Sequence, residues 1–203
     1  MKKYKFLTAL FLLLIFVIGC TTSNSVPVIV PTVSCDQTST PFQTSWTSLS
    51  YPVTTSPQNL VQEYTFSVNT NKTVCTIGYQ GSAVNFTNNT PYTIEIYNNT
   101  TNTSVYSGSL IFNSASVDYK TITPTNLIAN QSYTIRRIAS NANAPVTGPG
   151  AQSVGTWKNF TVTTAVFPLV SNGLTITGSK IYNGNLANLC TNCGLPFIDI
   201  VFQ

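Results

Sequence analysis

The sequence predicts an all-β fold, a single antiparallel β-sandwich resembling a jelly roll, over residues 41–203. Two observations lead to this prediction. Short runs of β-branched and aromatic residues recur between Asn-, Thr-, Gly- and Pro-rich clusters, as strands alternate with turns in a sandwich. No window sustains the 3.6-residue apolar period of an amphipathic helix. A segment of about 160 residues is an ordinary size for one domain, so no second domain is expected.

Alternation of apolar and polar residues identifies the expected strands. It is clearest in residues 92–97, where Tyr92, Ile94 and Ile96 share one face and the residues between them share the other. The other expected strands are residues 63–68, 73–79, 105–112, 117–122, 132–138, 157–163, 174–177 and 197–202. Turns are expected at residues 98–103 and 126–131, which are rich in Asn and Thr.

The N-terminus has the organisation of an export signal. Lysines within residues 2–5 precede an apolar run at residues 6–18, and Gly19 and Cys20 follow. A run of about 13 residues is too short to span a membrane, which takes roughly 20. The segment 17–20 resembles the lipobox of bacterial lipoproteins. We therefore expect a cleaved signal peptide at residues 1–19 and a lipid on Cys20; the alternative is an ordinary signal peptide with an incidental cysteine.

Residues 20–40 are rich in Thr, Ser, Pro and Val and are expected to form a flexible tether between the lipid and the domain. Cleavage removes three lysines, so the formal net charge falls from +4 to +1. No basic cluster remains beyond residues 136–137, which argues against nucleic acid as a partner. The expected location is the cell envelope outside the cytoplasm, on a membrane through the lipid of Cys20, and on the outer membrane if the source is Gram-negative.

Four cysteines remain once Cys20 carries lipid. Outside the cytoplasm an even number favours disulfides, and we prefer the pairs Cys35–Cys75 and Cys190–Cys193. A redox pair at residues 190–193 and a four-cysteine zinc site are the alternatives. The sequence has no histidine, so neither a metal site nor a cofactor is expected.

The absence of histidine also excludes Ser-His-Asp and Cys-His nucleophilic sites. A glycosidase needs only two carboxylates, roughly 5 to 9 Å apart. The acidic residues are scattered singly, so we expect Glu63, Glu95 and Asp118 to be solvated. Asp199 is expected to pair with one arginine of residues 136–137, which a strand would place on opposite faces. A non-catalytic protein is therefore expected.

Aromatic side chains are the remaining binding candidates, because ring faces stack on sugars and anchor protein interfaces. The expected ligand-binding residues are Trp157, Tyr97, Tyr182 and Arg136. Trp157 follows a long Ala-, Pro- and Gly-rich stretch and is expected at a loop edge, although a tryptophan in a sandwich often packs in the core. The expected ligand is a glycan or another surface polymer. The alternative is a structural or assembly role that binds a protein of the envelope.

A family resemblance adds to this interpretation. Residues 63–68, 92–97, 106–110, 123–134 and 197–202 resemble, in order and pattern, a bacterial extracellular domain family whose function is unknown. The resemblance covers about 140 residues and implies a β-sandwich of carbohydrate-binding type. The chain lacks the family's tryptophan in the last strand and its histidine-containing turn. That family has no established catalytic residues, so the resemblance implies a fold more than an activity.

Replacing Cys20 by serine should abolish lipid attachment. Metabolic labelling with a fatty-acid probe is expected to tag the wild-type chain and not the Cys20→Ser variant, because the acyl chains join the cysteine sulfur and its amino group. Equal labelling of the two chains would contradict the lipid anchor.

Overall fold

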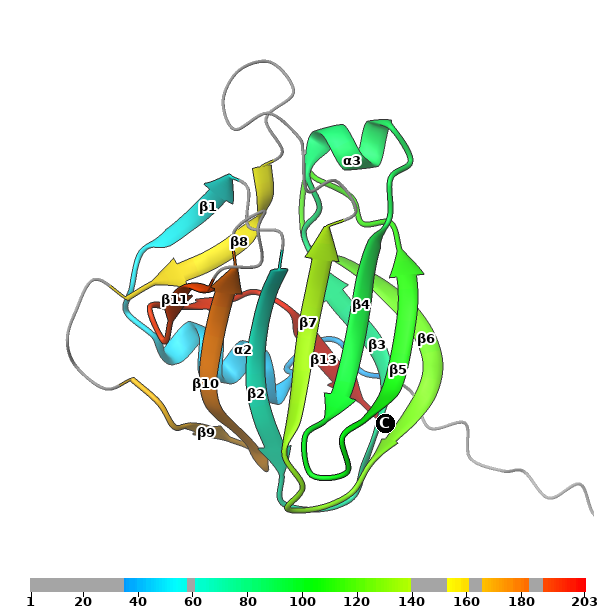
Figure 1. Ribbon diagram of the computed structural model, residues 1–203, viewed down its shortest axis with the longest axis vertical. Coiled ribbons are helices and arrows are strands. Elements are labelled where there is room, and N and C mark those ends of the chain that lie inside the picture. The colour runs from blue at the N-terminus through cyan, green and yellow to red at the C-terminus, as the bar shows by residue number, and fades with distance from the viewer. Residues whose placement is uncertain (1–34, 58–60, 140–152, 161–165, 183–187) are drawn as a thin grey trace, which may run out of the picture. The chain divides into compact units, whose positions relative to one another are not determined.

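The computed structural model describes residues 35–57, 61–139, 153–160, 166–182 and 188–203. This part of the chain is mostly β, and its antiparallel sheets pack against one another, which confirms the predicted all-β sandwich (Figure 1). Its strands are β1 (Val53–Pro57), β2 (Val61–Val68), β3 (Lys72–Tyr79), β4 (Tyr92–Asn98), β5 (Thr103–Leu110), β6 (Asp118–Leu127), β7 (Tyr133–Ala139), β8 (Ser153–Asn159), β9 (Leu169–Ser171), β10 (Leu174–Tyr182), β11 (Asn188–Thr191), β12 (Gly194–Pro196) and β13 (Asp199–Phe202). Its helices are α2 (Pro41–Ser48) and α3 (Ala83–Thr87).

The largest sheet has the strand order β11-β10-β2-β7-β4-β5, with β9 also paired to β10. In Figure 1 this sheet lies in front, and β3, β6 and β13 lie behind it. Those three strands form a second sheet in the order β13-β3-β6, and β1, β8 and β12 form a third. Each expected strand overlaps an observed one, although β8 begins four residues before the expected start at Trp157.

Aromatic side chains fill the core between the sheets. In β2 and β7, residues Tyr64, Phe66 and Tyr133 are almost fully buried, because alternate positions of these strands face inward. Ring centroids lie 5.8 Å apart for Tyr64 and Phe66 and 5.7 Å apart for Phe66 and Tyr133. Such pairs contribute about 0.5–1.5 kcal/mol each beyond the burial of their area.

Helix α2 was not predicted from the sequence, and its shortness explains why. Thr40 caps it by accepting a hydrogen bond from the Gln43 backbone N–H at 3.0 Å, and Pro41 takes the first helical position. Phe42 and Trp46 are buried, and the Phe42 ring stacks on Tyr64 at 5.4 Å. Eight residues provide one buried face but no repeated period, so the apolar pattern is too short to detect.

Both preferred disulfides are present, Cys35–Cys75 and Cys190–Cys193. The first joins the start of the described chain to β3, across 40 residues of sequence. Residues 35–40, expected to belong to the tether, are thus attached to the sandwich. Disulfides persist in oxidising compartments, so the pair indicates a location outside the cytoplasm.

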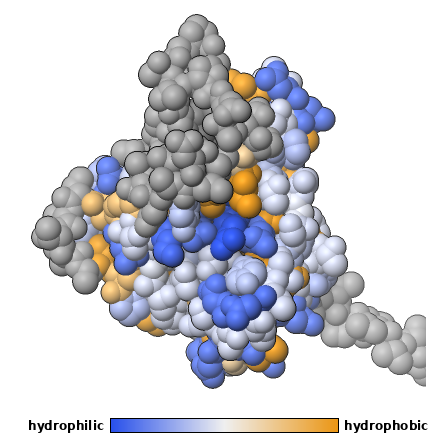
Figure 2. Space-filling model, in the orientation of Figure 1, coloured by the Kyte–Doolittle hydropathy of each residue, from blue (hydrophilic) through white to orange (hydrophobic). Residues whose placement is uncertain are grey.

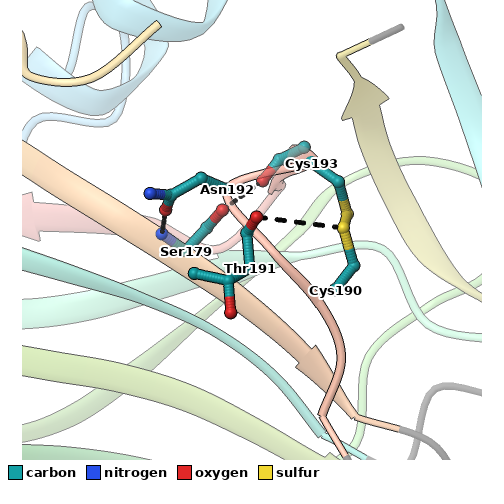
Figure 3. The surroundings of a disulfide bond; sticks show 6 residues. Ser179, Cys190, Thr191, Asn192 and Cys193 are labelled. Carbon is teal, nitrogen blue, oxygen red and sulfur yellow. Dashed lines mark hydrogen bonds between the residues drawn. A yellow bond between two sulfur atoms is a disulfide. The ribbon is translucent and has the colours of Figure 1, made fainter. Parts of the chain in front are cut away.

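The second disulfide closes the turn that connects β11 to β12, which hydrogen bonds to Ser179 also hold (Figure 3). Asn192 adopts a left-handed conformation, with φ of 58°. Its backbone N–H donates to the Ser179 carbonyl and its Oδ1 accepts from the Ser179 N–H, both at 2.9 Å. This turn is therefore attached to β10 by contacts that do not depend on the sulfur bridge.

Removing the long-range disulfide should destabilise the domain more than removing the short one. Closing a 40-residue loop restricts the unfolded chain by up to about 4 kcal/mol, against about 2 kcal/mol for the short loop. Urea unfolding of Cys35→Ala/Cys75→Ala is expected to show the larger loss of unfolding free energy, with Cys190→Ala/Cys193→Ala as the matched control. The reverse order would contradict this account.

Candidate functional site

A row of alternating charges crosses the outer face of the seven-stranded sheet. Lys180 of β10 lies opposite Glu63 of β2, and Glu63 lies opposite Arg136 of β7. Arg136 in turn lies opposite Glu95 of β4. Directly opposed residues of antiparallel strands project to the same face, so all four side chains share it. We call Lys180, Glu63, Arg136 and Glu95 the charge row.

Arg136 is the centre of the charge row. Its Nε lies 3.2 Å from Glu63 Oε2, and its Nη1 lies 3.3 Å from Glu95 Oε2. Its guanidinium carbon lies 5.7 Å from the centroid of the Tyr97 ring, within cation–π range. Tyr182 reaches the row from β10, since its hydroxyl donates to Glu63 Oε1 at 3.3 Å. Three of the four predicted binding residues, Tyr97, Tyr182 and Arg136, therefore belong to one cluster.

The cluster is partly exposed at the surface of the sheet. Exposed fractions of the side chains are 30% for Arg136, 20% for Glu95 and 10% for Glu63. Figure 2 shows hydrophilic residues gathered near the middle of this face. Burial, and then the nearby Glu63 carboxylate, raise the pKa of Tyr182, so its hydroxyl stays protonated at neutral pH. The face thus offers two half-buried tyrosine rings beside hydrogen-bonding groups of both kinds.

Two expectations about charged residues are wrong. Glu63 and Glu95 are not isolated solvated residues, because both form ion pairs with Arg136. Asp118 forms an ion pair within its own strand, with Lys120 at 2.9 Å, and its side chain stays partly exposed at 23%. The sequence could not predict the contacts of Glu63 and Glu95 with Arg136, since they depend on which strands are neighbours. Glu63 and Glu95 are the site residues that sequence reasoning missed.

Asp199 does not pair with an arginine, which corrects the third expectation. Its Oδ1 accepts from the Thr40 hydroxyl at 2.7 Å, and its Oδ2 accepts from Gln43 Nε2 and the Tyr119 hydroxyl, both at 2.8 Å. The side chain is fully buried. Asp199 therefore links β13 to the start of α2 and to β6, and it serves attachment of the N-terminal segment.

The arginines of residues 136–137 do point to opposite faces, as predicted. Arg137 is fully buried, and its guanidinium carbon lies 5.6 Å from the ring centroids of both Tyr79 and Tyr92. Ring faces attract a cation when water is excluded. The buried arginine is thus held by tyrosines where an ion pair with Asp199 was expected.

Trp157 lies apart from the cluster. It belongs to β8, in the sheet β1-β8-β12, and its register partner in β12 is Pro196. A Cβ atom on Gly194 would come within 2.2 Å of the Trp157 ring, so the ring packs directly on that glycine. The structure therefore does not unite Trp157 with the other three predicted binding residues.

Among the described residues, no group of three or more His, Cys, Asp or Glu side chains is placed to hold a metal ion. Within the same ranges, no helix has the length and apolar character needed to cross a membrane. Cys20 and the rest of residues 1–34 lie outside the described part of the chain.

Comparison with known protein families and with curated proteins found no match to this sequence. The resemblance to an extracellular domain family therefore stays a prediction, and the site has to be interpreted from its own chemistry.

Asp199 provides a pH-dependent test of the fold. Burial raises the pKa of Asp199 above its ordinary value of 3.8, so the folded state holds the proton more strongly than the unfolded chain. The contribution of Asp199 to the free energy of unfolding is fully present below pH 3.8, and it declines as pH rises through the higher pKa of the folded state. The stability advantage of the wild type over Asp199→Asn should therefore narrow as pH rises, as measured by urea unfolding from pH 3.5 to 7.

At neutral pH Asp199→Asn should still lower the unfolding free energy, by about 1–3 kcal/mol. An amide nitrogen in place of Oδ2 cannot accept hydrogen bonds from Gln43 and Tyr119. A gap between wild type and variant that widens with rising pH would contradict the raised pKa.

Proposed function

We propose that this chain is a lipid-anchored, extracytoplasmic binding module for a glycan or another surface polymer, and that it acts without catalysis. The observation that supports it is the cluster on the outer sheet face, where Tyr97, Tyr182 and Arg136 lie with Glu63 and Glu95. Ring faces pack against the C–H faces of sugars, while charged side chains exchange hydrogen bonds with hydroxyls.

The size of the face suits an elongated ligand. With strands about 4.8 Å apart and a rise of about 3.3 Å per residue, the register places the Cα atoms of Tyr97 and Tyr182 about 20 Å apart on a diagonal. Arg136 lies between them. A ligand that follows the charge row from β4 to β10 crosses four adjacent strands, so an elongated polymer fits it better than a single small molecule.

The position of Arg136 argues against hydrolysis. The carboxylates of Glu63 and Glu95 approach the same guanidinium, so their spacing falls near the range that glycosidases use. The guanidinium occupies the space between them, where a scissile bond would have to lie. Both carboxylates are thus engaged with a cation, which supports binding rather than acid–base catalysis.

Anchoring by Cys20 would keep this module at a membrane surface. Two or three acyl chains exceed the attachment that reversible binding needs, and residues 21–34 would act as spacer. The chain enters the described domain at Cys35, where the disulfide to Cys75 fixes it to the sandwich. The two disulfides agree with this compartment.

A protein partner in the envelope is the second candidate, and the edge of the sheet favours it. Strand β5 ends the seven-stranded sheet and runs for eight residues without a proline or a charged side chain. Edge strands without such features can pair with a strand of another chain. In-cell crosslinking that trapped a protein through β5 would support this role.

Removal of either ring should weaken polymer binding. Tyr97→Ala and Tyr182→Ala are each expected to weaken retention on a bound polysaccharide by about tenfold, because each removes one stacking surface. Phe86→Ala is the matched control, since Phe86 is an exposed aromatic residue on α3. Affinity electrophoresis across a polysaccharide panel gives the measurement. Unchanged retention in both tyrosine variants would overturn the proposed site.

A further inference from the structure

We propose that the charge row selects an uncharged, hydroxyl-rich polymer, and that Glu63 and Glu95 set this preference by holding Arg136 in ion pairs. This inference rests on the proposed function and names the class of polymer for the same site. Neutral polysaccharides have this chemistry, whereas polyuronates and polyamines carry the charges that the row would reject.

The charges of the row cancel along its length. Two basic residues, Lys180 and Arg136, alternate with two acidic residues, so the row has no net charge. Each carboxylate lies opposite at least one cation on the neighbouring strand. A charged polymer therefore meets no net potential of opposite sign, and electrostatic attraction adds nothing to its binding.

A polyanion would also have to separate Arg136 from its partners. The guanidinium contacts carboxylates on both sides, at 3.2 Å and 3.3 Å. An incoming carboxylate would compete with Glu63 and Glu95 and would approach both like charges closely. Like-charge approach at a partly buried site costs more than at a solvated surface, because screening is weaker there.

Sugar hydroxyls can hydrogen-bond to the Glu95 carboxylate and the Arg136 guanidinium while these two stay paired. Oε2 of Glu95 lies 3.3 Å from Arg136 Nη1, and the Glu95 side chain is 20% exposed, so a ligand can reach it. An ionised carboxylate has about four acceptor positions, so Glu95 can accept from hydroxyls without leaving Arg136. Hydroxyls both donate and accept, so one sugar can contact Glu95 and the guanidinium together. Glu95 is thus the specificity-determining residue in this proposal.

The test compares polymers of different charge on the full chain. Dextran and xyloglucan serve as uncharged probes, polygalacturonate as the polyanion and chitosan as the polycation, at about 0.05 M and about 0.5 M salt. We expect wild-type retention by an uncharged polymer, with less than about a twofold change between the two salt concentrations. Neither charged polymer should retain the protein.

Glu95→Gln frees one side of Arg136 and should alter the selectivity. This variant is expected to bind an uncharged polymer about tenfold more weakly and to gain retention by polygalacturonate that salt abolishes. Asp118→Asn is the matched control. It also removes one negative charge from an ion pair, but that pair, with Lys120, lies on a different sheet. The Asp118→Asn variant should be retained by each polymer to the same extent as the wild type.

The outcomes separate the inference from the proposed function. Wild-type retention by polygalacturonate or chitosan above that by the uncharged probes would overturn the inference and leave polymer binding intact. Glu95→Gln without any gain on polygalacturonate would also overturn it, because the ion pairs would then not restrain Arg136. No wild-type retention by any probe would overturn the proposed function itself.

Discussion

Cross-strand register is the constraint on which the candidate site depends. The central part of the charge row exists because β7 lies between β2 and β4, with Glu63 and Glu95 both opposite Arg136. A shift of one residue in β7 would turn Arg136 inward and place Arg137 outside, since neighbouring side chains alternate between faces. The core opposes such a shift, because Arg137 packs on two tyrosines in the interior. The interior packing therefore fixes the orientation of the exposed site.

A second set of contacts fixes where the chain enters the domain. The Cys35–Cys75 disulfide, the N-cap at Thr40 and the buried Asp199 all act on one short N-terminal segment. They connect it to β3 and β13, which belong to the sheet behind the seven-stranded sheet. The disulfide and Asp199 thus attach the N-terminal segment to a different sheet from the one that carries the charge row.

Sequence patterns predicted the class of fold and most strands because alternation is a local property. Residues 92–97 show this well, since their apolar positions are the buried positions of β4. Strand order is not local, and it decides which charged residues meet. Nothing in the sequence near Glu63 indicates a contact with Arg136, which is why the carboxylates were expected to be solvated. Asn172-Gly173, by contrast, is a local hairpin signal that could have located the turn into β10.

The charge row can be compared with a purely stabilising ladder of ion pairs. Cross-strand pairs contribute roughly 0.2–1 kcal/mol each, so a ladder alone could explain the row as part of the sheet. Two features go beyond that role. A stabilising ladder needs no aromatic neighbours, yet Tyr97 and Tyr182 contact two of its members. The chain is also poor in charge, at 7% of residues, and it concentrates four charged side chains in one row. Charges that are few and gathered beside rings support the proposed role in recognition, because hydroxyls and amides suffice to solvate the rest of this surface.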